Sequence, residues 1–393
     1  MNPRERVWRW LILPAVLLYA VLTWGSGIDR AAGDLATGGV WTPPALHSGT
    51  SFVEARRFVE AGIPGSALDP ARAALLSEPV NPAAPALLGM ALLGKRNMAA
   101  ADQAFRVAAR LGWREPLTQL YWFQTSLAQN DLNNAVLRFD AIARQHPDAP
   151  YIGVMARSLE RSSAGRDALA RRLVAGANWT GSYATIRDGT TSEQIAARVD
   201  VLNRVADLGR QIGCESMVQP ARVLAAVDPA AGARLWRRHC PRAAGQGLVI
   251  DGGFEQPVLA SLDTQVPFEW SVTGYGGLDA GLAPVKGGQA VQVRSSSSVT
   301  LPFIEQLVPL QPGTYRLSWR IEEPGSEQQR RLLASLSCAR DLVAAQPQAG
   351  MPLGDRLTRQ ISIPADCKAP WLRLWLAPGS ADVTVDDLRV EPI

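Results

Sequence analysis

The residues best suited to bind a ligand lie in one short run near the C-terminus, Trp371-Leu-Arg-Leu-Trp-Leu376. Side chains alternate between the two faces of a β-strand, so the three leucines share one face while Trp371, Arg373 and Trp375 share the other. Indole rings stack on the apolar faces of sugars, and a guanidinium donates hydrogen bonds to hydroxyls or to a carboxylate. The pattern therefore predicts a glycan-binding surface. The alternative is that both faces are covered, with the two tryptophans packed against loops or the helical part of the chain.

A second alternating run, Tyr315-Arg-Leu-Ser-Trp-Arg-Ile321, places apolar residues on one face and Arg316 and Arg320 on the other. If this strand lies beside the tryptophan-bearing strand, the two arginines join the same groove. Such a groove would suit an acidic glycan.

Four cysteines fall into two local pairs, Cys214 with Cys240 and Cys338 with Cys367. An even number of cysteines in an exported chain predicts disulfides, although the sequence alone permits three connectivities. A zinc site is excluded by the spacing, since no Cys-x-x-Cys or Cys/His cluster is present. Buried free thiols are the remaining alternative.

No set of residues predicts a catalytic centre. The three histidines, His47, His146 and His239, do not belong to a recognisable Ser-His-Asp or Cys-His arrangement. No glycine-rich phosphate-binding loop precedes a helix either. The net charge of +4 is spread without clusters, which argues against nucleic-acid binding.

The elements that carry the candidate residues belong to residues 244–393, where short alternating strands are separated by Gly/Pro turns and predict an antiparallel β-sandwich. This region resembles the jelly-roll carbohydrate-binding modules of the galactose-binding-like type. The resemblance depends on four segments: Ile250-Asp-Gly-Gly-Phe-Glu255, Phe268-Glu-Trp270, Pro312-Gly-Thr-Tyr315 and Val383-Thr-Val-Asp-Asp-Leu388.

The resemblance also implies a metal site. In such modules the acids of the opening and closing segments lie side by side and often bind a structural calcium, which here would involve Glu255 with Asp386 or Asp387. In the alternative, the two aspartates end a strand and pair with arginine. The same three acids could also act as a glycosidase pair, which is the less favoured prediction.

Residues 49–243 are predicted to be helical, and residues 82–150 repeat with a period of 34 residues. The repeat resembles the tetratricopeptide repeat, with small and large packing residues at corresponding positions, although Phe123 and Ser126 depart from the pattern. A non-repeating helical bundle is the alternative. Further helices are predicted at 192–212 and 218–237. Stacked helical hairpins are typical of proteins that hold other proteins, so a protein partner is expected to bind here.

Residues 1–24 form a basic tip followed by an uncharged apolar run, Trp10–Trp24, and predict a transmembrane anchor; residues 25–48 predict a linker. A cleaved signal peptide is the alternative. The expected protein is therefore a single-pass protein of the bacterial inner membrane with its bulk in the periplasm.

Together these features predict a multidomain α plus β chain that serves as a non-catalytic scaffold, with no cofactor other than a possible structural calcium. Proteins that combine an anchor, helical repeats and such a module occur in bacterial exopolysaccharide gene clusters, and this analogy favours a role in polysaccharide assembly or export. A protein-interaction scaffold without glycan binding is the alternative.

Overall fold

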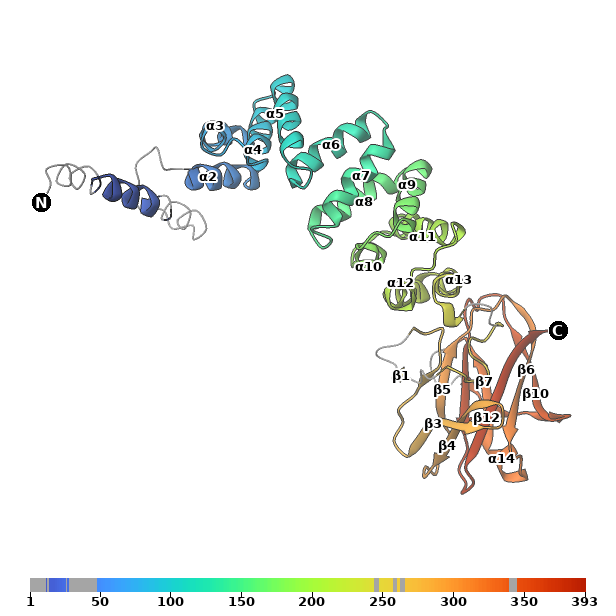
Figure 1. The fold of residues 1–393 in the computed structure, drawn as a ribbon. Coiled ribbons are helices and arrows are strands. Elements are labelled where there is room, and N and C mark those ends of the chain that lie inside the picture. The colour runs from blue at the N-terminus through green and yellow to red at the C-terminus, as the bar shows by residue number, and fades with distance from the viewer. Residues whose placement is uncertain are drawn as a thin grey trace, which may run out of the picture. The chain divides into compact units, whose positions relative to one another are not determined.

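The computed structural model describes residues 12, 14–25, 27, 48–243, 247–256, 260–261, 266–338 and 345–393. Helices occupy the first part of the chain and strands the last part (Figure 1). The chain divides into two compact units, residues 1–159 and residues 160–393. The second unit thus contains helices as well as the sandwich, whereas the sequence placed the boundary between the helical domain and the β-sandwich between residues 243 and 244.

The prediction of a single-pass membrane protein is corrected by the structure. In the described part of the chain, no helix combines the length and the apolar character that a membrane span requires. The helical residues 14–25 are fewer than the roughly 20 that cross a bilayer. Residues 1–11 and 13 of the predicted anchor, and residues 26 and 28–47 of the predicted linker, lie outside the described residues.

The first unit consists of consecutive antiparallel helices. Their bounds are α2 Ser48–Glu60, η2 Pro64–Ala67, α3 Leu68–Ser77, α4 Ala83–Gly94, α5 Met98–Leu111, α6 Pro116–Ala128, α7 Leu132–Ala143 and α8 Pro150–Glu160. The helices begin at good N-caps: Asn97 and Asp131 each accept a backbone N–H three residues ahead. Glu115 does the same for the start of α6, where Pro116 takes the first helical position.

Small and large side chains pack against each other in the core of this unit. A Cβ atom at Gly89 would lie 2.7 Å from Cε2 of Phe105, so only glycine lets α4 and α5 approach this closely. The Phe105 ring stacks on Tyr121 of the next hairpin with 4.0 Å between centroids. Phe105, Phe123 and Phe139 have no exposed surface. The aromatic rings therefore fill the space between successive hairpins.

The second unit begins with α9 Ser163–Val174, α10 Thr180–Ala184, α11 Ser192–Asp207, α12 Cys214–Val227, α13 Pro229–His239 and η3 Pro241–Ala243. The helix predicted at 218–237 is in fact two helices. Asp228 accepts the N–H of Ala231, and Pro229 occupies the first position of α13. This pair starts a new helix because proline removes a donor that would otherwise continue α12.

Two six-stranded sheets follow in the described residues. The first has the order β1 Ala260–Ser261, β2 Ser271–Val272, β5 Leu301–Leu307, β11 Trp371–Leu376, β7 Leu332–Ser337 and β8 Gln348–Ala349. The second has the order β3 Leu278–Val285, β4 Gly288–Ser295, β12 Val383–Pro392, β6 Gly313–Glu322, β10 Arg356–Ile363 and β9 Met351–Leu353. The short helix α14 Ser326–Arg331 precedes β7. Strand pairs are antiparallel except β1 with β2.

The two sheets enclose one apolar core, as expected for a sandwich. Leu372, Leu374 and Leu376 of β11 lie in it together with Leu317 and Trp319 of β6. The alternation read from the sequence is therefore correct for the inward face of both strands.

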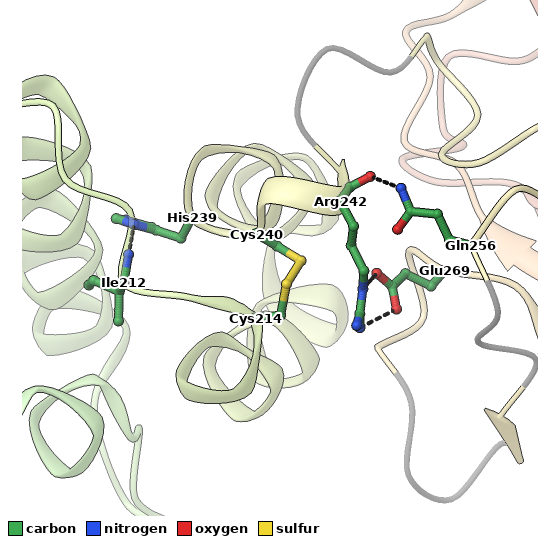
Figure 2. The surroundings of a disulfide bond; sticks show 7 residues. All are labelled: Ile212, Cys214, His239, Cys240, Arg242, Gln256 and Glu269. Carbon is green, nitrogen blue, oxygen red and sulfur yellow. Dashed lines mark hydrogen bonds and ion pairs between the residues drawn. A yellow bond between two sulfur atoms is a disulfide. The ribbon is translucent and has the colours of Figure 1, made fainter.

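Both local cysteine pairs are disulfides, Cys214–Cys240 and Cys338–Cys367. The first joins the start of α12 to the residue after α13, as Figure 2 shows. Two residues further on, Arg242 forms a two-bonded ion pair with Glu269 of the sandwich, at 2.7 and 2.9 Å. The disulfide thus links the two ends of the α12–α13 hairpin, and the ion pair links the residues just after the hairpin to the sandwich.

Candidate functional site

The predicted tryptophan surface is not presented to solvent. Arg373 is 1% exposed and Trp375 4% exposed, while Trp371 is half-buried. Arg373 Nε donates to Glu305 on the neighbouring β5 over 2.7 Å, and Trp375 Nε1 donates to Ser335 Oγ on β7 over 2.8 Å. These contacts correspond to the alternative that the sequence left open, in which the outward face of β11 is largely covered and the polar groups of Arg373 and Trp375 are already bonded.

Arg316 and Arg320 do not join these residues. They lie on β6 in the second sheet, whereas β11 belongs to the first. Both arginines point away from the core, so they face the opposite side of the sandwich from Trp371. Arg316 is exposed, and Arg320 is bound to Glu322 and Asp386 at 2.9 and 2.5 Å. The predicted acidic-glycan groove does not form from this set.

The three predicted metal ligands also have other partners. Asp386 accepts from the Arg320 guanidinium and from its neighbour's N–H, while Glu255 accepts the N–H of Gln289 at 3.3 Å. Asp387 pairs with two guanidinium groups. Among the described residues, no three His, Cys, Asp or Glu side chains form a metal-binding group. The surroundings do not fit calcium, because the positive charge of arginine already neutralises both aspartates.

A different feature brings the opening and closing segments together: an open pocket of about 270 Å³ between residues 247–253 and the second half of β12. Strand β4 pairs with β12 only from Val383 to Val385. Beyond Val385, this side of β12 faces the opening segment instead. The pocket is lined by Gly247, Leu248, Val249, Gly252, Gly253, Asp387, Leu388, Arg389, Val390 and Glu391.

Residues 247–253 form one wall of the pocket and are fixed by backbone hydrogen bonds. The buried Gln306 side chain bonds both the N–H and the carbonyl of Ile250, at 3.1 and 2.8 Å. Leu388 N–H donates to the Gly252 carbonyl at 2.7 Å. A Cβ atom at Gly252 would lie 2.0 Å from the Leu388 carbonyl oxygen, so glycine is required for this approach. The wall is therefore rigid before any ligand arrives.

The other wall carries alternating charges, Asp387, Arg389 and Glu391. Arg389 bonds both carboxylate oxygens of Asp387, at 2.7 and 2.9 Å, and its side chain remains 56% exposed. From behind, Arg356 contacts the carboxylate and the carbonyl of Asp387 and also Ser318 Oγ. Glu391 is exposed at the rim. Asp387 is thus held in place while Arg389 and Glu391 keep bonding capacity toward the pocket.

The electrostatics of this wall favour the ionised form of Asp387. Burial alone would raise the pKa of its carboxyl, but hydrogen bonds from Arg389 and Arg356 outweigh burial, so this pKa is lowered. For the neighbouring Asp386, burial has a larger effect on the pKa than the hydrogen bonds and charges around it. There burial raises the pKa, and the Asp387 N–H and the Arg320 charge offset it only in part.

Sequence reasoning singled out Asp387 as a candidate site residue, but it did not single out Arg389, Glu391 or the wall formed by residues 247–253. The signal was present in the closing strand, where Asp387, Arg389 and Glu391 alternate with the core residues Leu388 and Val390. Their common face could have been derived from that alternation. The pocket itself could not, because it depends on where β4 stops pairing with β12.

Comparison with known proteins yields structural similarity only. No protein-family model matches the chain, and no curated protein matches its sequence significantly. A solved structure described as "CBM4 structure and function" is 17% identical, with a TM-score of 0.26, over 37% of this chain and 99% of its own. TmCBM61 in complex with β-1,4-galactotriose is 15% identical, with a TM-score of 0.24, over 38% of this chain and 100% of its own.

The enzymatically active domain of tailspike protein 4 from bacteriophage CBA120 is 11% identical, with a TM-score of 0.25 over 39% of this chain. The match spans 21% of that protein. The sugar-binding and enzymatic roles in these descriptions belong to those proteins. For this chain, the similarity is confined to less than two fifths of its length.

Proposed function

We propose that this chain is a non-catalytic binding protein whose β-sandwich binds a glycan in the pocket between residues 247–253 and 387–391. The observation that carries the proposal is the exposed pair Arg389 and Glu391 on a strand whose backbone and neighbouring Asp387 are already fixed. A preorganised site loses little freedom when a ligand binds.

The chemistry of the pocket suits a neutral, hydroxyl-rich ligand. Sugar hydroxyls donate and accept, and a guanidinium beside a carboxylate offers both complements. Arg356 and Arg389 both pair with Asp387, and Arg316 lies opposite Glu391 in the pairing of β6 with β12. Each acid that lines the pocket therefore has a basic neighbour, and the pocket presents no cluster of unpaired cations to attract an acidic sugar. The glycan expected here is therefore neutral, in contrast to the acidic one that the sequence suggested.

The engaged state of the acids supports the non-catalytic part of the proposal. A glycosidase needs one carboxylate free to attack or to activate water and another free to donate a proton. Asp386 and Asp387 are instead bound to guanidinium groups. A place in exopolysaccharide assembly remains a prediction from the sequence resemblance.

The test is affinity electrophoresis of the full chain in gels containing soluble neutral or uronate-rich polysaccharides. We expect retardation by at least one neutral polysaccharide. Arg389→Ala and Glu391→Gln should each weaken binding by about 10-fold, because a hydrogen bond to a charged group contributes about 1.5–3 kcal/mol.

Arg294→Ala is the matched control, since Arg294 is an exposed, aspartate-paired arginine on the same sheet but on β4. It should leave binding unchanged. Retardation untouched by Arg389→Ala and Glu391→Gln, or equally reduced by Arg294→Ala, would reject the pocket. Absence of binding across the panel would reject the glycan proposal.

A further inference from the structure

Large apolar side chains are exposed at one end of the helices in the first unit, where α3 and α5 end. Their exposed fractions are 86% for Leu76, 79% for Val80, 45% for Val107, 39% for Leu111 and 52% for Trp113. Single exposed apolar residues are ordinary, but a group of five on adjacent elements indicates an interaction surface. We call these five residues, together with the exposed Arg110 and Arg114, the α3–α5 surface.

A close contact between the backbone at Gly112 and the ring of Pro82 brings the two halves of this surface together. A Cβ atom at Gly112 would lie 2.8 Å from Cγ of Pro82. Leu111 and Trp113 flank Gly112, and Val80 precedes Pro82 by two residues. The end of α5 therefore lies directly against the turn that follows α3.

The surface is also cationic. Arg110 and Arg114 are exposed, and within the part of the chain that the structure describes neither guanidinium has an ion-pair partner. A third cation, Arg138, lies over the Trp113 ring with 4.1 Å from Cζ to the ring centroid. It holds the indole in one orientation, which lowers the entropy lost when the other ring face is covered.

The acids nearby offset only part of this charge, because they are less exposed than Arg110 and Arg114. Glu115 is 7% exposed, and its carboxylate caps the start of α6 through the N–H groups of Leu117 and Thr118. Glu78 is half-buried and accepts from the Asn81 amide at 2.8 Å. The exposed charge next to the apolar side chains is therefore positive.

We infer that the α3–α5 surface binds a protein segment that carries apolar side chains together with Asp or Glu. Tryptophan and arginine are the residues most enriched where binding energy concentrates in protein interfaces. Carboxylates of the partner would pair with Arg110 and Arg114 while its apolar groups cover Leu111 and Trp113.

Charge complementarity favours this occupant over two others. A second copy of the chain meeting the same surface would place arginine against arginine. An anionic membrane is usually bound by clusters of four to eight Lys or Arg residues. Here two free arginines surround a tryptophan already held by Arg138.

The test is a random peptide library displayed on phage and selected on the full-length chain. We expect the selected peptides to be enriched in Asp, Glu and large apolar residues. One synthetic peptide is then measured by fluorescence anisotropy. Arg110→Glu with Arg114→Glu should weaken it about 10-fold or more, and replacing the peptide's acids by lysine should restore binding to that double variant.

Matched controls test whether the loss of peptide affinity is specific to the α3–α5 surface. Arg157→Glu, which reverses an exposed arginine on α8, should leave the affinity unchanged, and so should Arg389→Ala in the glycan pocket. Selected peptides without excess acids, or unaltered binding by the double variant, would overturn the inference. Cosedimentation with phosphatidylcholine–phosphatidylglycerol vesicles that the double variant abolishes would assign the surface to a membrane instead and would also overturn it.

Discussion

Trp375 carries a buried indole whose hydrogen bond to Ser335 ties β11 to β7 outside the apolar core. We predict that Trp375→Ala lowers the free energy of unfolding by about 3–5 kcal/mol, because it leaves a cavity and an unpaired hydroxyl. Trp371→Ala, at a half-buried position, should cost clearly less. Urea denaturation followed by near-UV circular dichroism measures both. Equal small effects would mean that the face of β11 is open after all.

The same residue shows where sequence reasoning about the site stops. Alternation correctly assigned the leucines of β11 to the core and the tryptophans to the other face. It could not tell that this face is buried, because the partners of Arg373 and Trp375 come from strands far away in sequence. Periodicity gives the direction of a side chain, and only the tertiary structure gives what covers it.

Within the helices, His239 joins the end of α13 to two other segments, and Figure 2 shows the contact with one of them at Ile212. Its Nδ1 accepts the Ile212 N–H at 3.3 Å, so Nε2 carries the proton that is donated to the Leu202 carbonyl at 2.9 Å. Burial lowers its pKa; the bond to Leu202 opposes this effect and the charge of Arg238 adds to it. The folded state therefore favours the neutral ring.

This preference predicts a pH dependence of stability. Below the unfolded-state pKa of about 6.5 the unfolded chain takes up a proton that folded His239 resists, so stability falls as pH decreases from there toward the folded pKa. Melting temperatures between neutral and mildly acidic pH should decline less steeply in His239→Gln, whose side chain does not titrate. A parallel decline in both proteins would remove His239 as the cause.

Elements were easier to predict than the contacts between them. The sequence pattern assigned Gly89 and Phe105 to packing positions of neighbouring helices, and the structure brings these two residues into contact. The contact is not repeated in the next unit, because Phe123 stands 34 residues after Gly89. The break at Asp228-Pro229 was also readable as a cap followed by proline, yet continuous apolar patterning masked it. The division at Leu159 and Glu160 had no comparable sequence signal.

At the scale of the second unit, the ion pair between Arg242 and Glu269 connects the helices to the sandwich. The side chains are 34% and 8% exposed, so the pair is only partly screened by water. A double-mutant cycle with Arg242→Ala and Glu269→Ala should give a coupling of about 1–3 kcal/mol. The exposed pair Arg294 with Asp279 is the control and should give less than about 1 kcal/mol. Similar coupling energies for the two pairs would show that the ion pair between the helices and the sandwich contributes no more than an ordinary surface ion pair.

The Cys214–Cys240 disulfide has a consequence for how the chain can be divided. Because it closes the whole α12–α13 hairpin, a protease that cuts any peptide bond between these cysteines leaves the two fragments covalently linked. The nicked protein would still run as one species on a gel without reductant and separate into two once reductant is added. The disulfide therefore keeps the sandwich covalently attached to the preceding part of the chain even when the backbone of this hairpin has been cut.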